Sequence, residues 1–239
     1  MKTLVTLCGI LMLMGACRVG FNSVRGSGNK ITQSRNTNDF KKVEVGGPMD
    51  VEITMGNDYK VDVEADDNLM AYIIVKKEGD KLVVRLKDNV NADYDDGMKV
   101  KIEMPLLNAV ELSGSGSIKT IGQVSNNDKI SISIGGSGNV DMDNVKSPVI
   151  DAAIGGSGKA TVAGQTQKLD VSIGGSGDFI APDLKSENAK VSIAGSGNAK
   201  IFASMDLDVS IVGSGDVIYS GSPRISKNVL GSGSIRSAQ

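Results

Sequence analysis

Apolar and polar residues alternate with a period of two along most of this chain from residue 39 onward. "KISISI" at 129–134 and "LDVSI" at 169–173 are typical, and Val and Ile supply many of the apolar positions. Such alternation is typical of β-strands that bury one face. Residues 66–75 come nearest to a helical pattern and predict at most a turn. The pattern therefore predicts an all-β protein.

Seven of the alternating runs are followed by the tripeptide Gly-Ser-Gly. Its serines recur every 18–22 residues, at Ser115, Ser137, Ser157, Ser176, Ser196, Ser214 and Ser232. A period of this size is the signature of a solenoid. Glycines at superposed corners would let the backbones of stacked coils approach closely. We therefore predict a parallel β-helix-like solenoid with coils of about 20 residues.

The glycine-rich turns have an alternative interpretation as phosphate-binding loops. The nearest candidate is "AIGGSGKA" at 153–160. A P-loop requires G-x-x-x-x-G-K-[ST] ahead of a helix. Here Ala153 replaces the first glycine, Ala160 replaces the Ser or Thr, and a strand-like stretch follows. We therefore interpret the turns as scaffold and expect no bound nucleotide.

The first 17 residues, "MKTLVTLCGILMLMGAC", place Lys2 ahead of a short apolar run. The run is too short to span a bilayer as a helix and is typical of a signal peptide. Met14-Gly15-Ala16-Cys17 resembles a bacterial lipobox, with Met14 where leucine is usual. We predict that residues 1–16 are a lipoprotein signal peptide and that Cys17 is lipidated. The alternative is an ordinary secretory signal that contains a cysteine.

The remaining chain divides by composition. Residues 17–38 are polar, contain a further Gly-Ser-Gly at 26–28, and predict a flexible tether. Residues 39–239 are the expected folded domain, made of a non-repeat β-rich half (39–105) and a repeat half (106–239). Its end offers a poor cap, so the last coil would leave an edge strand open to self-association. We therefore expect that the chain can form homo-oligomers.

The composition argues against several classes of protein. The chain has no histidine, and its two cysteines are Cys8 and Cys17. The commonest general base and the usual ligands of transition metals are therefore missing from the mature domain. The formal net charge is −2, and Lys and Arg are interspersed with acidic residues. A nucleic-acid partner would need a basic stripe. We expect no nucleic acid, no metal and no cofactor.

Acidic residues are the remaining candidates for chemistry. One cluster in a predicted loop consists of Asp93, Asp95 and Asp96. Its carboxylate oxygens could be calcium ligands, although the sequence does not follow the EF-hand order. Asp141 and Asp143 flank Met142 and predict an outward strand face. Glycoside hydrolysis needs two facing carboxyl groups, but the aspartates of the repeats form no paired motif: Asp151, Asp170, Asp178, Asp208 and Asp216. Aromatic residues suited to binding sugars are equally sparse in the repeats, namely Phe179, Phe202 and Tyr219. We expect no catalytic residue.

The order of the segments resembles a known family. "FKKVEVGGPMDVEITMG" at 40–56, "KVDVEADDNLM" at 60–70, "KLVVRL" at 81–86 and "VELSGSGSI" at 110–118 lead into the array of GSG turns. This order is similar to that of the head GIN family of autotransporter-adhesin-like proteins, which are secreted or lipid-anchored and common in Bacteroidetes. The resemblance covers about residues 39–235. It implies a right-handed β-helix-like fold and supplies no catalytic residues.

Three function classes follow. The expected one is a non-catalytic, lipid-anchored envelope protein, an adhesin-like module that binds a protein or a glycan. The alternatives are a polysaccharide-active β-helix enzyme and a structural or lipid-handling component of the envelope. We expect an outer-membrane lipoprotein, at the periplasmic face or the cell surface, held in the membrane by its N-terminal lipid.

Overall fold

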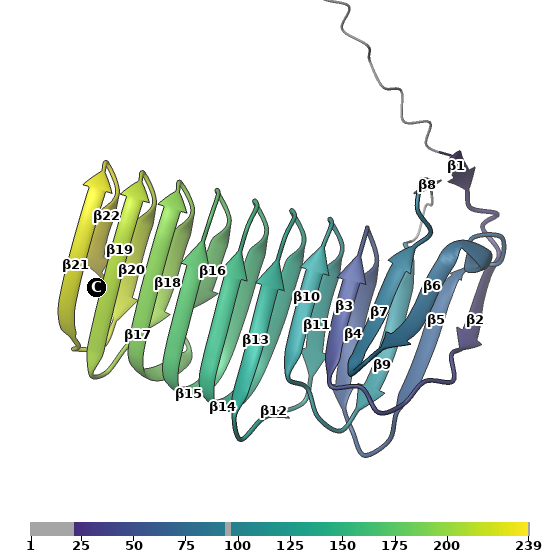
Figure 1. Ribbon diagram of the computed structural model, residues 1–239, viewed down its shortest axis with the longest axis horizontal. Coiled ribbons are helices and arrows are strands. Elements are labelled where there is room, and N and C mark those ends of the chain that lie inside the picture. The colour runs from purple at the N-terminus through teal and green to yellow at the C-terminus, as the bar shows by residue number, and fades with distance from the viewer. Residues whose placement is uncertain (1–21, 94–96, 239) are drawn as a thin grey trace, which may run out of the picture.

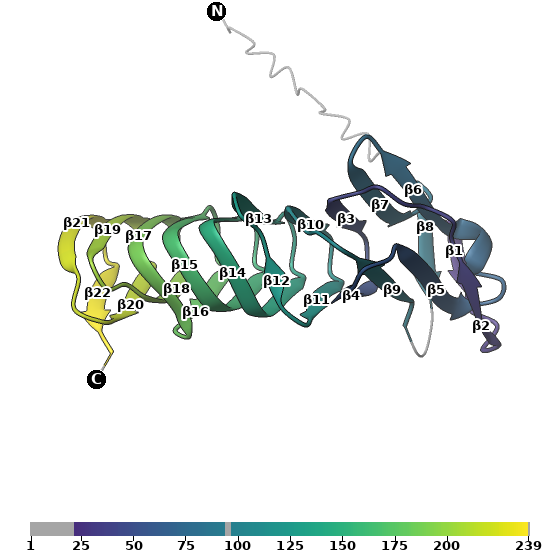
Figure 2. The same cartoon turned by 90° about the horizontal axis from the view of Figure 1, so that it is seen from below.

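The computed structural model describes residues 22–93 and 97–238 and shows an elongated β-solenoid closed at one end by additional strands (Figures 1 and 2). Two parallel stacks of strands run along the solenoid and enclose its core. Within the described residues, the one helical element is a short 3-10 turn, η1 (Met70–Tyr72). The prediction of an all-β protein is confirmed. The prediction that residues 66–75 form at most a turn is confirmed as well.

The first stack, face A, consists of parallel strands in the order β7 (Lys81–Leu86), β3 (Lys42–Gly46), β10 (Ala109–Ser113), β13 (Lys129–Ile134), β14 (Asn139–Ile154), β15 (Lys159–Ile173), β17 (Leu184–Gly195), β19 (Asp206–Gly213) and β21 (Arg224–Gly231).

The second stack, face B, has the order β9 (Lys99–Met104), β4 (Asp50–Met55), β11 (Ser117–Ile121), β14, β15, β16 (Asp178–Ala181), β18 (Asn198–Phe202), β20 (Asp216–Ser220) and β22 (Ser234–Ser237). The long strands β14 and β15 bend and serve both faces. Between the faces runs a short third side, which starts at β12 (Val124–Ser125) and continues through the middle of β14 and β15 into β17.

The N-terminal end is closed by antiparallel strands. β6 (Ile73–Glu78) pairs with β7, β5 (Lys60–Asp66) pairs with β9, and β2 (Lys30–Ser34) pairs with β5. A separate parallel pair joins β1 (Asn22–Arg25) to β8 (Val90–Asp93). The coil formed by β7 and β9 stacks on the outer side of β3 and β4, although it follows them in the chain. The non-repeat half therefore caps the solenoid.

The core consists mainly of aliphatic residues in straight ladders. Ile130, Ile150 and Leu169 are successive partners on face A, and all three are fully buried. Among the described residues, Phe40 and Phe179 are the two aromatic residues with fully buried side chains. Because each coil adds one rung to every ladder, the apolar positions of the alternating sequence pattern meet inside.

The Gly-Ser-Gly tripeptides form one stacked corner between faces A and B. The backbone N–H of Ser137 donates to the carbonyl of Gly114 at 2.9 Å, and the N–H of Ser157 donates to that of Gly136 at 3.0 Å. Gly47 takes the equivalent place before the array, since its carbonyl accepts from the N–H of Gly116 at 3.1 Å. This ladder confirms that the repeated glycines are architectural.

The prediction that residues 17–38 form a flexible tether is wrong for residues 22–38, because strands β1 and β2 lie there. The Gly-Ser-Gly at 26–28 packs against the end of β5 and the loop that follows it. The hydroxyl of Ser27 donates to Oδ1 of Asp67 at 2.5 Å, and the N–H of Gly28 donates to Oδ2 of Asp66 at 3.0 Å. These partners lie about 40 residues away, so composition alone could not indicate them.

Within the described residues, no further coil stacks on β21 and β22. Lys227 on β21 is in register with Val209, a fully buried core residue, but it lies in the last coil and is exposed. Ile225 on the same strand is 41% exposed, because no further coil covers it. A charged residue at an inward position is one way in which proteins protect an edge strand from pairing.

We predict that Gly136→Ala destabilises the solenoid by about 1–3 kcal/mol, the typical cost of overpacking. A Cβ at residue 136 would lie 2.3 Å from the carbonyl oxygen of Gly114, whereas one at Gly135 meets nothing within 4 Å. Gly135→Ala is therefore the matched control, with an expected change within about 0.5 kcal/mol. Urea unfolding of the two variants checks this. Equal losses of stability would contradict the steric role of the stacked corner.

We predict that Lys227→Val promotes association through the last coil. The change extends the apolar ladder that contains Val209 to the last coil and removes the edge charge. Light scattering over a range of concentrations should show a larger mean mass than for the unmodified chain. Asn228→Val, whose position is in register with outward-facing Ser210, is the control. If both variants associate equally, the inward charge is not what protects the edge.

Candidate functional site

A groove of about 630 Å³ crosses five successive coils along the third side. We call it the polar groove. It is lined by Gln123, Ser125, Asn126, Asn127, Lys146, Ser147, Pro148, Gln165, Thr166, Gln167, Lys185, Ser186, Glu187, Phe202 and Ser204. Four steps of the usual spacing between strands give it a length of about 19 Å.

The parallel register arranges the lining into rows. Row one consists of exposed residues in direct register: Ser125, Lys146, Gln165 and Lys185. Row two lies two positions further along β14, β15 and β17 and contains Pro148, Gln167 and Glu187. Because side chains alternate across a strand, both rows face outward from the same side. Equivalent side-chain positions therefore recur at the coil spacing, although the residues that occupy them differ.

Buried hydroxyl groups lie between the two rows, at Ser147, Thr166 and Ser186. The hydroxyl of Ser147 donates to the carbonyl of Val149 at 3.0 Å, and that of Thr166 donates to the carbonyl of Lys168 at 3.0 Å. Ser186 donates to the carbonyl of Phe202 in the neighbouring coil. The chain bends here from the third side into face A, and the hydroxyls satisfy backbone carbonyls at the bend. The floor of the groove is thereby fixed.

The two ends of the groove are also held by polar contacts. At the N-terminal end, Nδ2 of Asn126 donates to Oδ1 of Asn108 at 2.8 Å, and its Oδ1 accepts from the N–H of Asp128 at 2.8 Å. At the other end, the ammonium of Lys185 lies 4.3 Å from the ring centroid of Phe202. This distance is within the range of a cation–π interaction, which favours one position of the ammonium group.

Among the described residues, neither Lys146 nor Lys185 forms an ion pair. Glu187 is the one carboxylate of the lining. The side-chain amides of Gln165 and Gln167 are exposed. The groove therefore offers unpaired cations, amides and a half-buried aromatic ring to a ligand.

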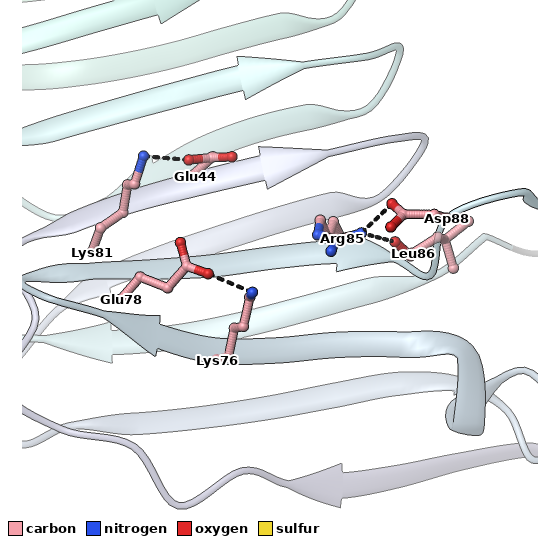
Figure 3. A network of polar contacts seen from close by, with 7 residues as sticks. All are labelled: Glu44, Lys76, Glu78, Lys81, Arg85, Leu86 and Asp88. Carbon is pink, nitrogen blue, oxygen red and sulfur yellow. Dashed lines mark hydrogen bonds and ion pairs between the residues drawn. The ribbon is translucent and has the colours of Figure 1, made fainter.

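By contrast, a cluster of charged residues around Lys81 near the N-terminal end pairs its charges internally (Figure 3). The ammonium of Lys81 bonds Glu44 and lies 3.2 Å from Glu111. The hydrogen bond to Glu44 is the main reason that the pKa of Lys81 is raised. Close by, the hydrogen bond from Lys76 lowers the pKa of Glu78. This cluster neutralises its own charges and holds strands together, so it leaves less for a ligand than the polar groove does.

Residues 39–223 match the family described as "Putative auto-transporter adhesin, head GIN domain". The chain belongs to the head GIN family. The resemblance inferred from the sequence is therefore confirmed over most of the folded domain. None of the curated proteins compared with this chain matches it.

Solved structures resemble this head GIN protein over nearly its whole length. A putative adhesin from Bacteroides fragilis has a TM-score of 0.85 at 24% identity, over 90% of this chain and 100% of that one. A protein titled as a putative lipid binding protein, from Parabacteroides distasonis, has a TM-score of 0.76 at 27% identity, over 91% and 100%. A putative adhesin from Parabacteroides merdae reaches 0.68 at 23% identity, over 91% and 99%.

The predicted lipidation site of this head GIN protein, Cys17, lies outside the described residues, as do Asp95 and Asp96 of the acidic loop. Asp93 is described at the end of β8. Within 22–93 and 97–238, no group of three or more His, Cys, Asp or Glu side chains is placed to hold a metal ion. Those residues also form no helix long and apolar enough to cross a bilayer.

The aspartates of the repeats lie outside the polar groove. Asp141 and Asp143 flank fully buried Met142, as expected of an outward face. Asp151 and Asp170 are register partners on face A, and each lies within ion-pair distance of a lysine of its own face. The other three are spread over both faces, Asp178 and Asp216 on face B and Asp208 on face A.

The three aromatic residues of the repeats have different environments. Phe179 is fully buried in the core, Tyr219 is half-buried on β20, and Phe202 lines the polar groove. Sequence reasoning noted Phe202 but missed the rest of the groove. A usable signal was the small hydroxyl residue that recurs ahead of the face A strand, at Ser147, Thr166 and Ser186. Its period matches that of the glycine corners.

Proposed function

We propose that this protein is a non-catalytic, adhesin-like binding module of the cell envelope, and that its polar groove binds a glycan chain lengthwise. The observation that carries the proposal is the groove itself, which crosses five coils and repeats its outward rows at each coil. A linear polysaccharide also repeats its chemical groups along its axis. Family membership supports an adhesin-like role.

The chemistry of the lining supports a glycan over an apolar ligand. Small-molecule sites for apolar ligands are lined mainly by hydrophobic side chains. The polar groove instead presents amides at Gln165 and Gln167 and one half-buried ring at Phe202. Amides donate and accept hydrogen bonds, which suits sugar hydroxyls.

The lining also supports a binding role over hydrolysis. Glycosidases commonly place two carboxyl groups on either side of the scissile bond. The described lining of the polar groove contains one carboxylate, at Glu187. The polysaccharide-active alternative would therefore need a second acidic group from elsewhere.

Lipid handling is a second candidate, since a relative with 27% identity is titled as a putative lipid binding protein. A lipid would need apolar surface. A second hollow, of about 520 Å³, provides some of it through the exposed side chain of Ile225, which lies beside the buried Leu169 and Leu207. Its remaining lining is largely charged or polar, so we rank this candidate below the glycan.

Attachment to the outer membrane is part of the proposal and depends on Cys17. We predict that cells fed a labelled fatty acid will label this protein and that Cys17→Ser will abolish the label, because lipidation needs the thiol. Cys8→Ser, in the segment expected to be cleaved, is the matched control and should retain the label. Labelling that persists in Cys17→Ser would point to an ordinary secretory signal.

We predict that the protein is retained on an immobilised polysaccharide without releasing reducing ends. Gln165→Ala and Phe202→Ala should each reduce the affinity several-fold, since the first loses hydrogen bonds and the second loses ring contacts, each of about 0.5–1.5 kcal/mol. Gln33→Ala is the matched control, because Gln33 is an exposed glutamine on β2, far from the groove in the fold.

Three outcomes would contradict this proposal. Release of reducing ends would indicate an enzyme, and retention that is unchanged in Gln165→Ala would place binding outside the groove. Failure to bind any polysaccharide would remove the glycan proposal. Binding of phospholipid vesicles in that case would favour lipid handling.

A further inference from the structure

Row one of the polar groove carries its charges at alternate coils. Lys146 and Lys185 are separated by Gln165, and the three are in direct register. Two steps of the strand spacing place the lysine positions about 10 Å apart. This separation is comparable with the disaccharide repeat of an extended polysaccharide.

Row two, unlike row one, contains no positively charged residue. It contains Pro148, Gln167 and Glu187, so its one charged member is acidic. A carboxylate of a ligand that faced row two would meet Glu187, and like charges at short range are unfavourable. In an extended glycan with twofold symmetry, successive sugars present their substituents to opposite sides. A chain with a carboxylate on every sugar would therefore direct half of its charges toward row two.

We propose that the polar groove is selective for a linear acidic polysaccharide that carries one carboxylate per disaccharide. This inference rests on the proposed function. Lys146 and Lys185 each pair with a carboxylate, and Gln165 forms hydrogen bonds with the neutral sugar between them. The ring of Phe202 holds the ammonium of Lys185 at the C-terminal end of the row. Glu187 disfavours chains of higher charge density, which is selection by repulsion.

Calorimetric titration of the full folded chain tests this with three probes of equal length. Hyaluronan oligosaccharides carry a carboxylate on alternate sugars, carboxyl-reduced hyaluronan carries none, and oligogalacturonate carries one on every sugar. We expect hyaluronan oligosaccharides to bind more tightly than either of the other two. Binding should also weaken as salt is raised, because ion pairs at an exposed site are screened.

Single substitutions test which residues of the two rows cause the selectivity. Lys146→Gln and Lys185→Gln should each weaken binding of hyaluronan oligosaccharides by up to about fivefold, the upper range for an exposed ion pair. Lys159→Gln is the matched control, because Lys159 is an exposed lysine of face B outside the groove. Glu187→Gln should narrow the preference for hyaluronan over oligogalacturonate. Thermal melting of each variant confirms that it is folded.

The outcomes separate this inference from the proposed function. If carboxyl-reduced hyaluronan binds as tightly as the acidic form, or if folded Lys146→Gln binds as well as the unmodified chain, the inference is wrong while glycan binding stands. Tighter binding of oligogalacturonate than of hyaluronan would overturn the role of row two. If no glycan binds, the proposed function fails and the inference fails with it.

Discussion

The close approach of backbones at the glycine corner is the constraint on which the rest of this structure depends. Each coil donates N–H groups to the carbonyls of the corner before it, as from Ser214 to Gly195 and from Ser232 to Gly213, both at 2.9 Å. A Cβ at most of these glycines would lie less than 3 Å from a backbone atom of the preceding coil. Backbone has little freedom to move away, so the corner excludes side chains at these positions. Because every corner lies over the previous one, the register of both faces is fixed along the solenoid.

Because the register is fixed, residues at equivalent positions of successive coils line up in rows. The polar groove is one consequence of this alignment. On faces A and B the outward rows lie on the broad surface of a sheet. On the short third side the chain bends within a few residues, and small hydroxyl residues such as Thr166 sit between the two outward rows. Their buried hydroxyl groups bond backbone carbonyls and so hold the bend that shapes the hollow. The groove therefore exists because small polar residues occur at the bend in successive coils.

The parts of the fold that could be predicted are those set by local periodicity. The spacing of the Gly-Ser-Gly serines predicted the coils, and alternation predicted which residues are buried. The stacking of β7 and β9 on the outer side of β3 and β4 could not be predicted, because it depends on pairing between segments about 40 to 50 residues apart. The docking of Ser27 on Asp67 was missed for the same reason. The groove was missed because its lining comes from five separate coils, and no single stretch of sequence carries the whole pattern.

The stacked architecture also explains how lysine and glutamine side chains that each form weak contacts can together form a binding surface. Binding usually loses free energy when side chains and loops become ordered. Here the backbone beneath Lys146, Gln165 and Lys185 is one continuous parallel sheet, with further coils on both sides. The buried hydroxyls anchor the bend, and the ring of Phe202 restricts Lys185. The ligand therefore meets groups whose spacing is set before it binds, and selectivity can come from matching that spacing rather than from many strong contacts.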